Sequence, residues 1–215
     1  MSEATESNKE NKNELNMEFW DERWKQNQTG WDMNAVSPPL KAYIDTIVNK
    51  GVAILIPGCG NAYEAEYLLE NGFSNVTLID ISPTLVMSLL EKLKKYAGRE
   101  LTIICGDFFR HYGQYDIILE QTFFCALSPD LRKAYAEKMH SLLSESRKLV
   151  GILFNKEFEK GPPFGGNKEE YLALFADFFE IEKMEDCYNS IAPRAGTELF
   201  IELKKKEIEQ VEDQA

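Results

Sequence analysis

A glycine-containing turn and a carboxylate at neighbouring strand ends are the residues of this sequence best suited to chemistry. The apolar run 52–56 leads into Pro-Gly-Cys-Gly at 57–60, and a second apolar run ends in Asp80. Glycine has no Cβ and adopts positive φ freely, so a ligand can approach its backbone. A carboxylate at the tip of the next strand can accept hydrogen bonds from ribose hydroxyls. The spacing predicts a site for a nucleoside-containing cofactor at Gly58, Gly60 and Asp80.

Two other interpretations of the turn stay open on these residues alone. An NAD or FAD site favours G-x-G-x-x-G, but Tyr63 occupies the position of the third glycine. A turn without a ligand also fits, because Asp80 can cap the turn into Ser82-Pro83. The twenty-residue separation between Gly60 and Asp80 favours the cofactor site, since it places the turn and the acid on consecutive strand ends.

An acidic residue also follows the next two apolar runs. Asp107 can accept a hydrogen bond from an adenine amino group, and Phe108 can offer a backbone N–H and an aromatic wall. Glu120 can hold an ammonium group, and the faces of Phe123 and Phe124 suit a positively charged sulfonium. A capped turn and core phenylalanines are the structural alternatives, and we expect at least one of Phe123 and Phe124 in the core.

Three tryptophans precede the first of these strand ends. Trp20, Trp24 and Trp31 fall within twelve positions, which predicts an aromatic cover over the site. Packing of an N-terminal helix on the sheet explains Trp20 or Trp24 equally well. Trp31 follows a glycine in a loop, so it is the better ligand candidate.

The bulk composition excludes several classes of protein. A hydrophobic content of 44% in 215 residues supports one domain with a core. The formal net charge of −12 argues against a nucleic-acid surface and favours a small substrate. Four scattered cysteines and two histidines predict neither a zinc site nor a disulfide framework, and they fit reduced thiols in the cytoplasm. We expect no signal peptide and no membrane span.

The elements that must position these residues alternate between strands and helices after residue 52. The predicted strands cover residues 52–56, 76–79, 101–105, 115–119, 148–154, 178–187 and 197–203, and the predicted helices cover 17–28, Ser37 to Gly51, 62–70 with Asn61 as N-cap, 83–96, 129–143 and 168–176. The last two strands have no helix between them, so they pair antiparallel. An α/β, doubly wound sheet of seven strands with a reversed last strand follows.

The predicted domain covers residues 17–204, with tails at 1–16 and 205–215. Its N-terminal helices form a cover over the sheet. The loop 160–167 is rich in glycine and proline and is too long for a tight turn, which makes it a candidate lid.

Seven short motifs occur in order along the chain. They are F-W-x-x-R-W at 19–24, G-W-D at 30–32, P-G-C-G at 57–60, G-D-F-F at 106–109, T-F-F-C-A-L at 122–127, G-P-P-F at 161–164 and P-R-x-G-x-E at 193–198. With them the chain resembles the thiopurine S-methyltransferase family, and most closely its halide/thiol methyltransferase branch. The predicted sheet likewise resembles the Rossmann-like sheet of class I S-adenosylmethionine-dependent methyltransferases.

The resemblance implies a role for each candidate residue. The cofactor would be S-adenosylmethionine, lined by Trp20, Trp24, Trp31, Gly58, Asp80, Asp107, Phe108 and Glu120. Phe123, Arg194 and the loop 161–164, with Pro163 and Phe164, would lie nearer the substrate. Gly58 and Asp80 favour the halide/thiol branch, whereas Gln121 departs from the tyrosine common in its plant halide enzymes and leaves the acceptor open.

We therefore expect a cytoplasmic, monomeric methyltransferase acting on a small thiol, thiopurine, halide or thiocyanate. We expect no nucleic-acid or membrane partner and no bound metal. An anionic nucleophile attacking a sulfonium needs alignment rather than a base, so no catalytic residue is predicted. An NAD-dependent oxidoreductase and a non-catalytic cofactor-binding module are the alternatives.

Overall fold

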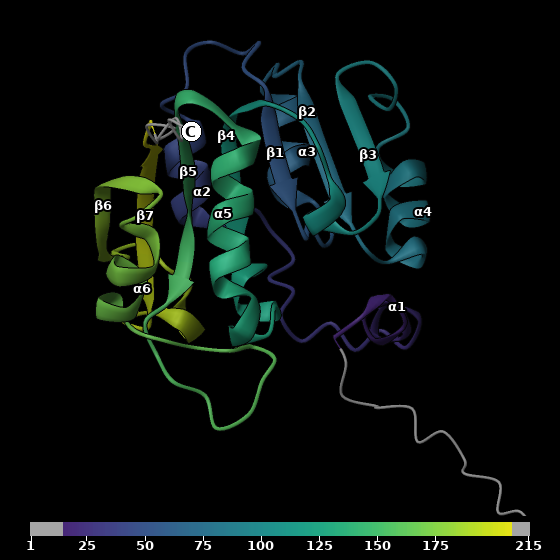
Figure 1. The fold of residues 1–215 in the computed structure, drawn as a ribbon. Helices are drawn as coiled ribbons and strands as arrows, with labels where there is room; N and C mark the ends of the chain where they lie inside the picture. The colour runs from purple at the N-terminus through teal and green to yellow at the C-terminus, as the bar shows by residue number, and fades with distance from the viewer. Residues whose placement is uncertain (1–14, 208–215) are drawn as a thin grey trace, which may run out of the picture.

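One mixed sheet of seven strands forms the centre of the computed structural model, which describes residues 15–207 (Figure 1). The strands are β1 (Ile54–Pro57), β2 (Val76–Asp80), β3 (Leu101–Cys105), β4 (Tyr115–Gln121), β5 (Leu143–Phe154), β6 (Phe179–Asp186) and β7 (Glu198–Lys205). Their order is β3-β2-β1-β4-β5-β7-β6; the first five are parallel, and β7 runs antiparallel to both β5 and β6. The predicted seven-stranded sheet with a reversed last strand is confirmed.

Helices cover both faces of this sheet because its central strands are apolar on both sides. One face carries α2 (Pro38–Ile44), α3 (Tyr63–Glu70) and α4 (Pro83–Lys92), and the other carries α5 (Arg132–Leu142) and α6 (Lys168–Phe175). In β1, Ile54 and Ile56 face the first core and Leu55 faces the second, each at most 2% exposed. This double burial explains why β1 is an uninterrupted apolar run.

Side-chain caps mark the start of several helices, among them α1 and α4. Asn16 Oδ1 accepts the N–H of Phe19 at 3.0 Å at the start of α1 (Met17–Lys25). Ser82 Oγ accepts the N–H of Leu85 at 3.2 Å at the start of α4. Both residues satisfy amide groups that the first turn of a helix leaves without an acceptor.

The start of α3 differs from the prediction. Asn61 does not cap this helix, because its side-chain amide donates to Asp32 Oδ2 instead. Ala62 occupies the capping position with a left-handed φ of 56° and no side-chain cap. A contact across 29 residues of sequence therefore outweighs the local capping preference of asparagine.

The second helix is shorter than predicted. The expected span from Ser37 to Gly51 ends at Ile44 in the structure. The hydroxyl of Thr46 donates to the carbonyl of Tyr43 at 2.7 Å, which offers the backbone an alternative to the next helical turn. Val48, within the predicted span but beyond the end of the helix, is 92% exposed.

The predicted tails fall mostly outside the described residues. Residues 1–14 and 208–215 are not described; of the remainder, Asn16 caps α1 and Lys205 ends β7. Between residues 15 and 207, no helix combines the length and apolar character that crossing a bilayer requires.

Candidate functional site

The carboxyl ends of β1 to β5 meet at one end of the sheet, where the arrowheads of these strands point downward in Figure 1. α1 and the loop between β5 and α6 lie at the same end. The predicted residues Gly58, Asp80, Asp107 and Glu120 lie at the ends of four different strands here. Parallel pairing thus brings together residues that are distant in the sequence, at the place where doubly wound sheets bind ligands.

The turn after β1 adopts a conformation that favours glycine. Gly58 and Gly60 have φ angles of 56° and 50°, and the Gly58 N–H donates to the carbonyl of Ile79 at 2.8 Å. A Cβ on Gly58 would lie 2.3 Å from the ring of Phe123, whereas a Cβ on Gly60 would meet no atom of the described chain within 4 Å. Packing requires Gly58 to be glycine, and Gly60 leaves open space beside the strand ends.

Asp80, at the tip of β2, is a half-buried acceptor beside this turn. Burial raises the pKa of Asp80 to about 6, although hydrogen bonds from the backbone of Ser82, Gly60 and Ile81 oppose the shift. The Ser82 N–H donates to Asp80 Oδ1 at 2.9 Å. A carboxylate has about four lone-pair positions, and these three backbone donors leave one of them free, so Asp80 can accept from a further donor such as a ribose hydroxyl.

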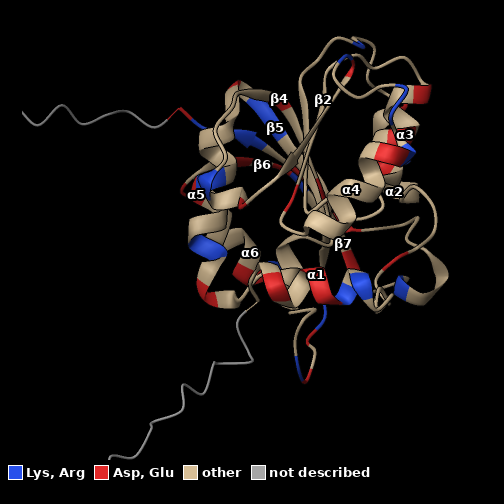
Figure 2. Ribbon diagram, turned by 90° about the vertical axis from the view of Figure 1, so that its right-hand side faces the viewer, with Lys and Arg blue, Asp and Glu red and all other residues tan. Residues whose placement is uncertain are grey.

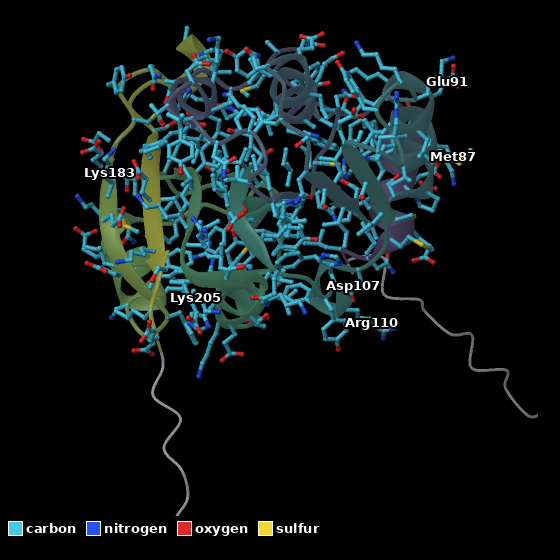
Figure 3. All side chains as sticks on the ribbon, turned by 90° about the horizontal axis from the view of Figure 1, so that it is seen from above. Met87, Glu91, Asp107, Arg110, Lys183 and Lys205 are labelled. Atoms are coloured by element: carbon cyan, nitrogen blue, oxygen red, sulfur yellow. The ribbon has the colours of Figure 1, made fainter. Side chains whose placement is uncertain are left out.

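Asp107 and Phe108 both make contacts within the protein at the end of β3. Asp107 Oδ1 accepts the N–H of Phe109 at 2.9 Å, and Oδ2 lies 3.8 Å from Arg110 Nε, with both labelled side chains at one edge of the molecule in Figure 3. The Phe108 ring is 5% exposed and packs edge-on against Phe123, with 5.1 Å between ring centroids. A capped turn with a core phenylalanine is therefore present. The Phe108 ring is buried, so it exposes little aromatic surface to a ligand. Contact of Asp107 with a cofactor stays a prediction.

Glu120 is completely buried and engaged within the protein. Its Oε1 accepts the N–H groups of Phe123 at 2.8 Å and Phe124 at 2.9 Å, and its Oε2 accepts the Tyr135 hydroxyl at 2.6 Å. Burial raises the pKa of Glu120 to about 7 despite these donors. This carboxylate therefore supports the turn after β4, and its contact with a ligand's ammonium group stays a prediction. Phe124, 2% exposed, is the expected core member of its pair.

Residues 15–37 cross the carboxyl end of the sheet as one segment, called here the N-terminal strap. α1 is its first part and carries acidic and basic side chains close together at the lower end of the molecule in Figure 2. The Trp31 ring meets the rings of Trp20 and Trp24 edge-on, at centroid distances of 5.7 and 5.8 Å. The three predicted tryptophans therefore form one cluster centred on Trp31, and Trp24 also packs on the core.

The strap is attached to α4 through Asp21, a residue that the sequence analysis missed. Asp21 Oδ1 accepts the Ser82 hydroxyl at 2.7 Å and the Thr84 N–H at 2.8 Å, directly after the Asp80 strand end. Hydrogen bonds from Lys25 and Ser82 hold the pKa of Asp21 well below its usual range. Asp21 lies three residues before Trp24, on the apolar side of α1. This spacing could have indicated from the sequence that the charge of Asp21 is buried.

The middle of the strap is attached at two further places. Asp32, in the G-W-D motif, accepts hydrogen bonds from the Asn61 side chain and from the Tyr63 hydroxyl next to the glycine turn. The Trp31 carbonyl accepts a hydrogen bond from Arg194 Nη2 at 2.9 Å. These contacts place the tryptophan cluster between the turn after β1 and the loop before β7.

The positive charge of Arg194 is paired with a negative charge within the protein. Its Nη1 lies 3.4 Å from Glu198 Oε1, and its guanidinium stacks over the Phe154 ring, with its central carbon 5.5 Å from the ring centroid. The side chains of Arg194 and Glu198 are 13% and 5% exposed, so the ion pair is largely buried. The charge of Arg194 is therefore neutralised within the protein.

The loop after β5 is held against the turn after β4. The Phe164 N–H donates to the carbonyl of Cys125 at 2.7 Å, and the Arg132 guanidinium donates to the carbonyl of Gly165. The predicted lid is thus pinned beside the site, with Pro163 exposed at its surface. Burial raises the pKa of Cys125 to about 12, which leaves its thiol neutral and poorly nucleophilic.

A surface hollow of about 390 Å³ lies at the opposite end of the sheet. The loop before β4 and the end of α5 line it, with His111, Gln114 and Lys138 among the residues. Ligands of doubly wound sheets bind outside the carboxyl ends of the strands. The convergent residues of the strand ends, and not this hollow, are therefore the candidate site.

Asp21→Ala should loosen the strap and lower the stability of the protein. The change leaves the buried Ser82 hydroxyl and the Thr84 N–H without their acceptor, so we expect the free energy of unfolding in urea to fall by about 1–3 kcal/mol at neutral pH. Because the pKa of Asp21 is lowered, this contribution is present above the ordinary carboxyl pKa and is lost as the pH falls through the lowered value. Glu18→Ala, on the exposed side of α1, is the control, and an equal loss there would contradict the assignment.

The chain is similar to known proteins over most of its length. A family model described as Thiopurine S-methyltransferase (TPMT) matches residues 15–213. The probable thiol methyltransferase 2 of Arabidopsis thaliana is 28% identical over 191 residues, which cover 86% of this chain and 84% of the relative. The thiopurine S-methyltransferase of Acinetobacter baylyi is 28% identical over 191 residues, covering 79% and 88%.

A solved structure shares the fold. The 1,6-didemethyltoxoflavin-N1-methyltransferase of Burkholderia thailandensis, crystallised with 1,6-didemethyltoxoflavin and S-adenosylhomocysteine, superposes with a TM-score of 0.70. The alignment covers 89% of this chain and 87% of that chain at 18% identity. At this identity the likeness concerns the arrangement of the sheet and helices.

Proposed function

This chain belongs to the thiopurine S-methyltransferase family, and we propose that it transfers a methyl group to a small sulfur or halide nucleophile. Its membership of this family and its similarity to the relatives identify it as an S-adenosylmethionine-dependent methyltransferase that acts on a small molecule. The choice among thiol, thiopurine, halide and thiocyanate is the proposed part.

One observation carries the proposed cofactor site: the half-buried Asp80 carboxylate faces the Gly60 turn, and the space beside Gly60 is open within the described chain. A ribose needs an acceptor for its hydroxyls and a backbone without a Cβ beside it, so the residues fit an adenosyl group. We assign Gly58, Gly60 and Asp80 to that group. The other proposed contacts are Trp20, Trp24, Trp31, Asp107 and the backbone N–H of Phe108.

The chain's own residues contribute binding, alignment and exclusion of water. Bound S-adenosylmethionine supplies a methyl group on a sulfonium, which departs as a neutral thioether and needs no general acid. The strap covers the strand ends through its tryptophan cluster, and Glu120 fixes the turn that carries Phe123. Holding two reactants in line can lower a barrier by on the order of 7–11 kcal/mol. This chemistry assigns no catalytic base.

The acceptor side of the proposed site lies toward β5 and β7. Phe123 packs under the glycine turn, and Phe164 is tied to the turn after β4. Pro163 and Arg194 lie on the loops that follow β5 and precede β7. We assign these four residues to the surroundings of the acceptor.

We propose a single catalytic domain over residues 17–204 that works as a cytoplasmic monomer without a nucleic-acid partner. The net charge of −12 disfavours binding to phosphate backbones. All four cysteines are free thiols, which suits a reducing compartment.

Calorimetry followed by an acceptor panel tests the proposed function. S-adenosylhomocysteine should bind the full chain, whereas NADH should not, and binding of NADH alone would favour the oxidoreductase. With S-adenosylmethionine present, at least one of a thiol, a thiopurine, iodide or thiocyanate should release S-adenosylhomocysteine. Binding without turnover of any acceptor would leave a non-catalytic binding module.

Cofactor affinity should depend on pH through Asp80. Ribose hydroxyls donate hydrogen bonds to the ionised form of the Asp80 carboxylate. In the folded protein without a ligand, the pKa of Asp80 is about 6. Affinity should therefore rise as the pH increases through about 6 and level off above it, and the Kd for S-adenosylhomocysteine should increase up to about tenfold per pH unit below it. Calorimetry between about pH 5 and pH 8 measures this dependence.

Two variants of Asp80 serve as controls for that dependence. Asp80→Ala should weaken S-adenosylhomocysteine binding by about 1–3 kcal/mol at neutral pH, because the hydroxyls lose a charged acceptor. Asp80→Asn should bind with little pH dependence in the same range. An unchanged Kd in Asp80→Ala, or a wild-type Kd that is flat across pH 6, would reject Asp80 as the ribose acceptor.

A further inference from the structure

Lys92, the last residue of α4, makes three contacts with the start of α3. Its Nζ donates to the Asn61 carbonyl at 3.1 Å, lies 2.9 Å from Glu66 Oε2 and sits over the Tyr63 ring, 4.8 Å from the ring centroid. A single ion pair near the surface contributes little and leaves a lysine side chain free to move. A carbonyl, a carboxylate and an aromatic face together fix the ammonium group in one place.

The carbonyl that Lys92 binds belongs to a turn with an unusual backbone. Gly58, Gly60 and Ala62 have φ angles of 56°, 50° and 56°. Glycine adopts such angles freely, whereas the Cβ of an alanine makes the left-handed region unfavourable. Ala62 is buried and has no side-chain cap, and the helical hydrogen bonds of α3 begin at its own carbonyl. Lys92 therefore holds the peptide group of Asn61, directly before the strained residue, from a different helix.

The residues that Lys92 contacts also hold the N-terminal strap. Asp32 of the strap accepts hydrogen bonds from the Asn61 side chain and from the Tyr63 hydroxyl. Trp31, at the centre of the tryptophan cluster, directly precedes Asp32. A displacement of Asn61 and Tyr63 would therefore move the glycine turn and the strap together.

We propose that Lys92 is a positioning residue of the cofactor site, which holds the left-handed turn and, through it, the strap in the arrangement that binds S-adenosylmethionine. Lys92 acts through Asn61 and Tyr63 and makes no contact with the cofactor itself. The effect on cofactor affinity rests on the proposed function. The effect on the strap is a property of the protein without a ligand, so the two effects can be measured separately.

Tryptophan fluorescence reports on the strap alone, because all three tryptophans of the chain lie in it. Lys92→Met keeps a side chain of similar length and removes the ammonium group. In the protein without a ligand, it should shift the tryptophan emission to longer wavelength and increase quenching by acrylamide, because a loosened strap exposes its rings to water. Lys92→Arg keeps a cationic donor for the Asn61 carbonyl and should retain most of the wild-type emission.

Cofactor affinity should follow the same pattern. Lys92→Met should increase the calorimetric Kd for S-adenosylhomocysteine about 5- to 20-fold, as expected for the loss of a hydrogen bond from a charged donor. The matched control is Lys94→Met, two residues further along the chain. Lys94 is 71% exposed and pairs only with Glu91 among the described residues, so its loss should change neither the Kd nor the emission.

Ala62→Gly tests the mechanism, because it removes the strain that Lys92 opposes. Glycine takes a φ of 56° without a steric cost. Ala62→Gly combined with Lys92→Met should therefore recover most of the lost affinity and most of the wild-type emission. Loss of the buried Ala62 methyl group lowers stability further, as urea denaturation should show. A recovery of affinity in a less stable protein cannot come from a general effect on folding.

Several outcomes would overturn the assignment. Unchanged emission and Kd in Lys92→Met would show that the contacts are not used, and an emission shift with an unchanged Kd would remove the role in cofactor binding. Equal losses in Lys94→Met would assign the effect to net charge. A full loss in Glu66→Gln would assign it to the ion pair, and a loss that Ala62→Gly does not reverse would reject the turn as the link. If the wild type fails to bind S-adenosylhomocysteine, the proposed function is rejected, whereas the emission of Lys92→Met still decides whether Lys92 holds the strap.

Discussion

Gly58→Ala is expected to weaken S-adenosylhomocysteine binding by at least about 100-fold and to lower the free energy of unfolding by roughly 1–3 kcal/mol. The added Cβ would lie 2.3 Å from Phe123 Cδ2 and 2.8 Å from its Cγ, closer than atoms can pack. The φ of 56° adds strain that glycine avoids. Relief of the clash must displace either the Phe123 ring or the turn that carries Gly60, and both belong to the proposed site.

Two further variants separate the clash from the backbone strain. Gly72→Ala places alanine at a φ of 83° with no described atom within 4 Å, so it tests strain alone and should leave cofactor affinity unchanged. Gly58→Ala combined with Phe123→Ala removes the nearest ring atoms and should recover part of the lost stability. Calorimetry and urea denaturation measure both quantities. An affinity loss in Gly72→Ala equal to that in Gly58→Ala would refute the packing explanation.

Glu120→Ala is expected to lower the free energy of unfolding by about 3–5 kcal/mol, because it leaves three donors buried without an acceptor. Two of them are the backbone N–H groups of Phe123 and Phe124, and the third is the Tyr135 hydroxyl. The turn after β4 should lose its order, so cofactor and acceptor affinities should fall with stability. Glu120→Gln keeps one acceptor oxygen and should retain most of both.

The pH dependence of stability distinguishes an ionisable Glu120 from a purely structural one. Its pKa in the folded protein, about 7, lies above its ordinary value of 4.5. The folded state therefore holds a proton that the unfolded state has released, and the contribution of this group to stability is greatest below about 4.5 and declines as the pH rises toward 7. Urea denaturation across this range should show a decline in the wild type that Glu120→Gln lacks. A parallel decline in both proteins would place its source elsewhere.

The fold could be predicted from the sequence because the hydrophobic patterns that indicate its strands and helices are local and strong. Apolar runs such as 52–56 and 76–79 are covered on both faces, so they lack the polar alternation of an exposed strand. The absence of a helical pattern between 187 and 197 predicted the antiparallel pairing of β6 with β7. Errors arose where a tertiary contact or a side-chain hydrogen bond replaced a local preference, as at Asn61 and at the end of α2.

The site could be predicted only in part from the sequence. A carboxylate at a strand end has the same sequence pattern whether it faces a cofactor or accepts hydrogen bonds from the protein itself. Asp80 and Glu120 both follow apolar runs, and both were predicted to bind the cofactor. The structure separates them: Asp80 faces the Gly60 turn, whereas three donors within the protein engage Glu120. Strand alternation directs Glu120 toward Tyr135 on α5, and no local pattern specifies which helix lies there.

Local sequence patterns were enough to predict the alternation of strands and helices, the reversed last strand and the glycine turn with its acid, since each depends on residues close together in the chain. The pairing of buried polar groups, in contrast, depends on how the folded chain brings distant segments together. The attachment of Asp21 to Ser82, of Trp31 to Arg194 and of Glu120 to Tyr135 joins distant segments. Whether a buried oxygen such as Gln121 Oε1 finds a partner among the described residues depends on where every competing donor lies, and that is a property of the folded chain alone.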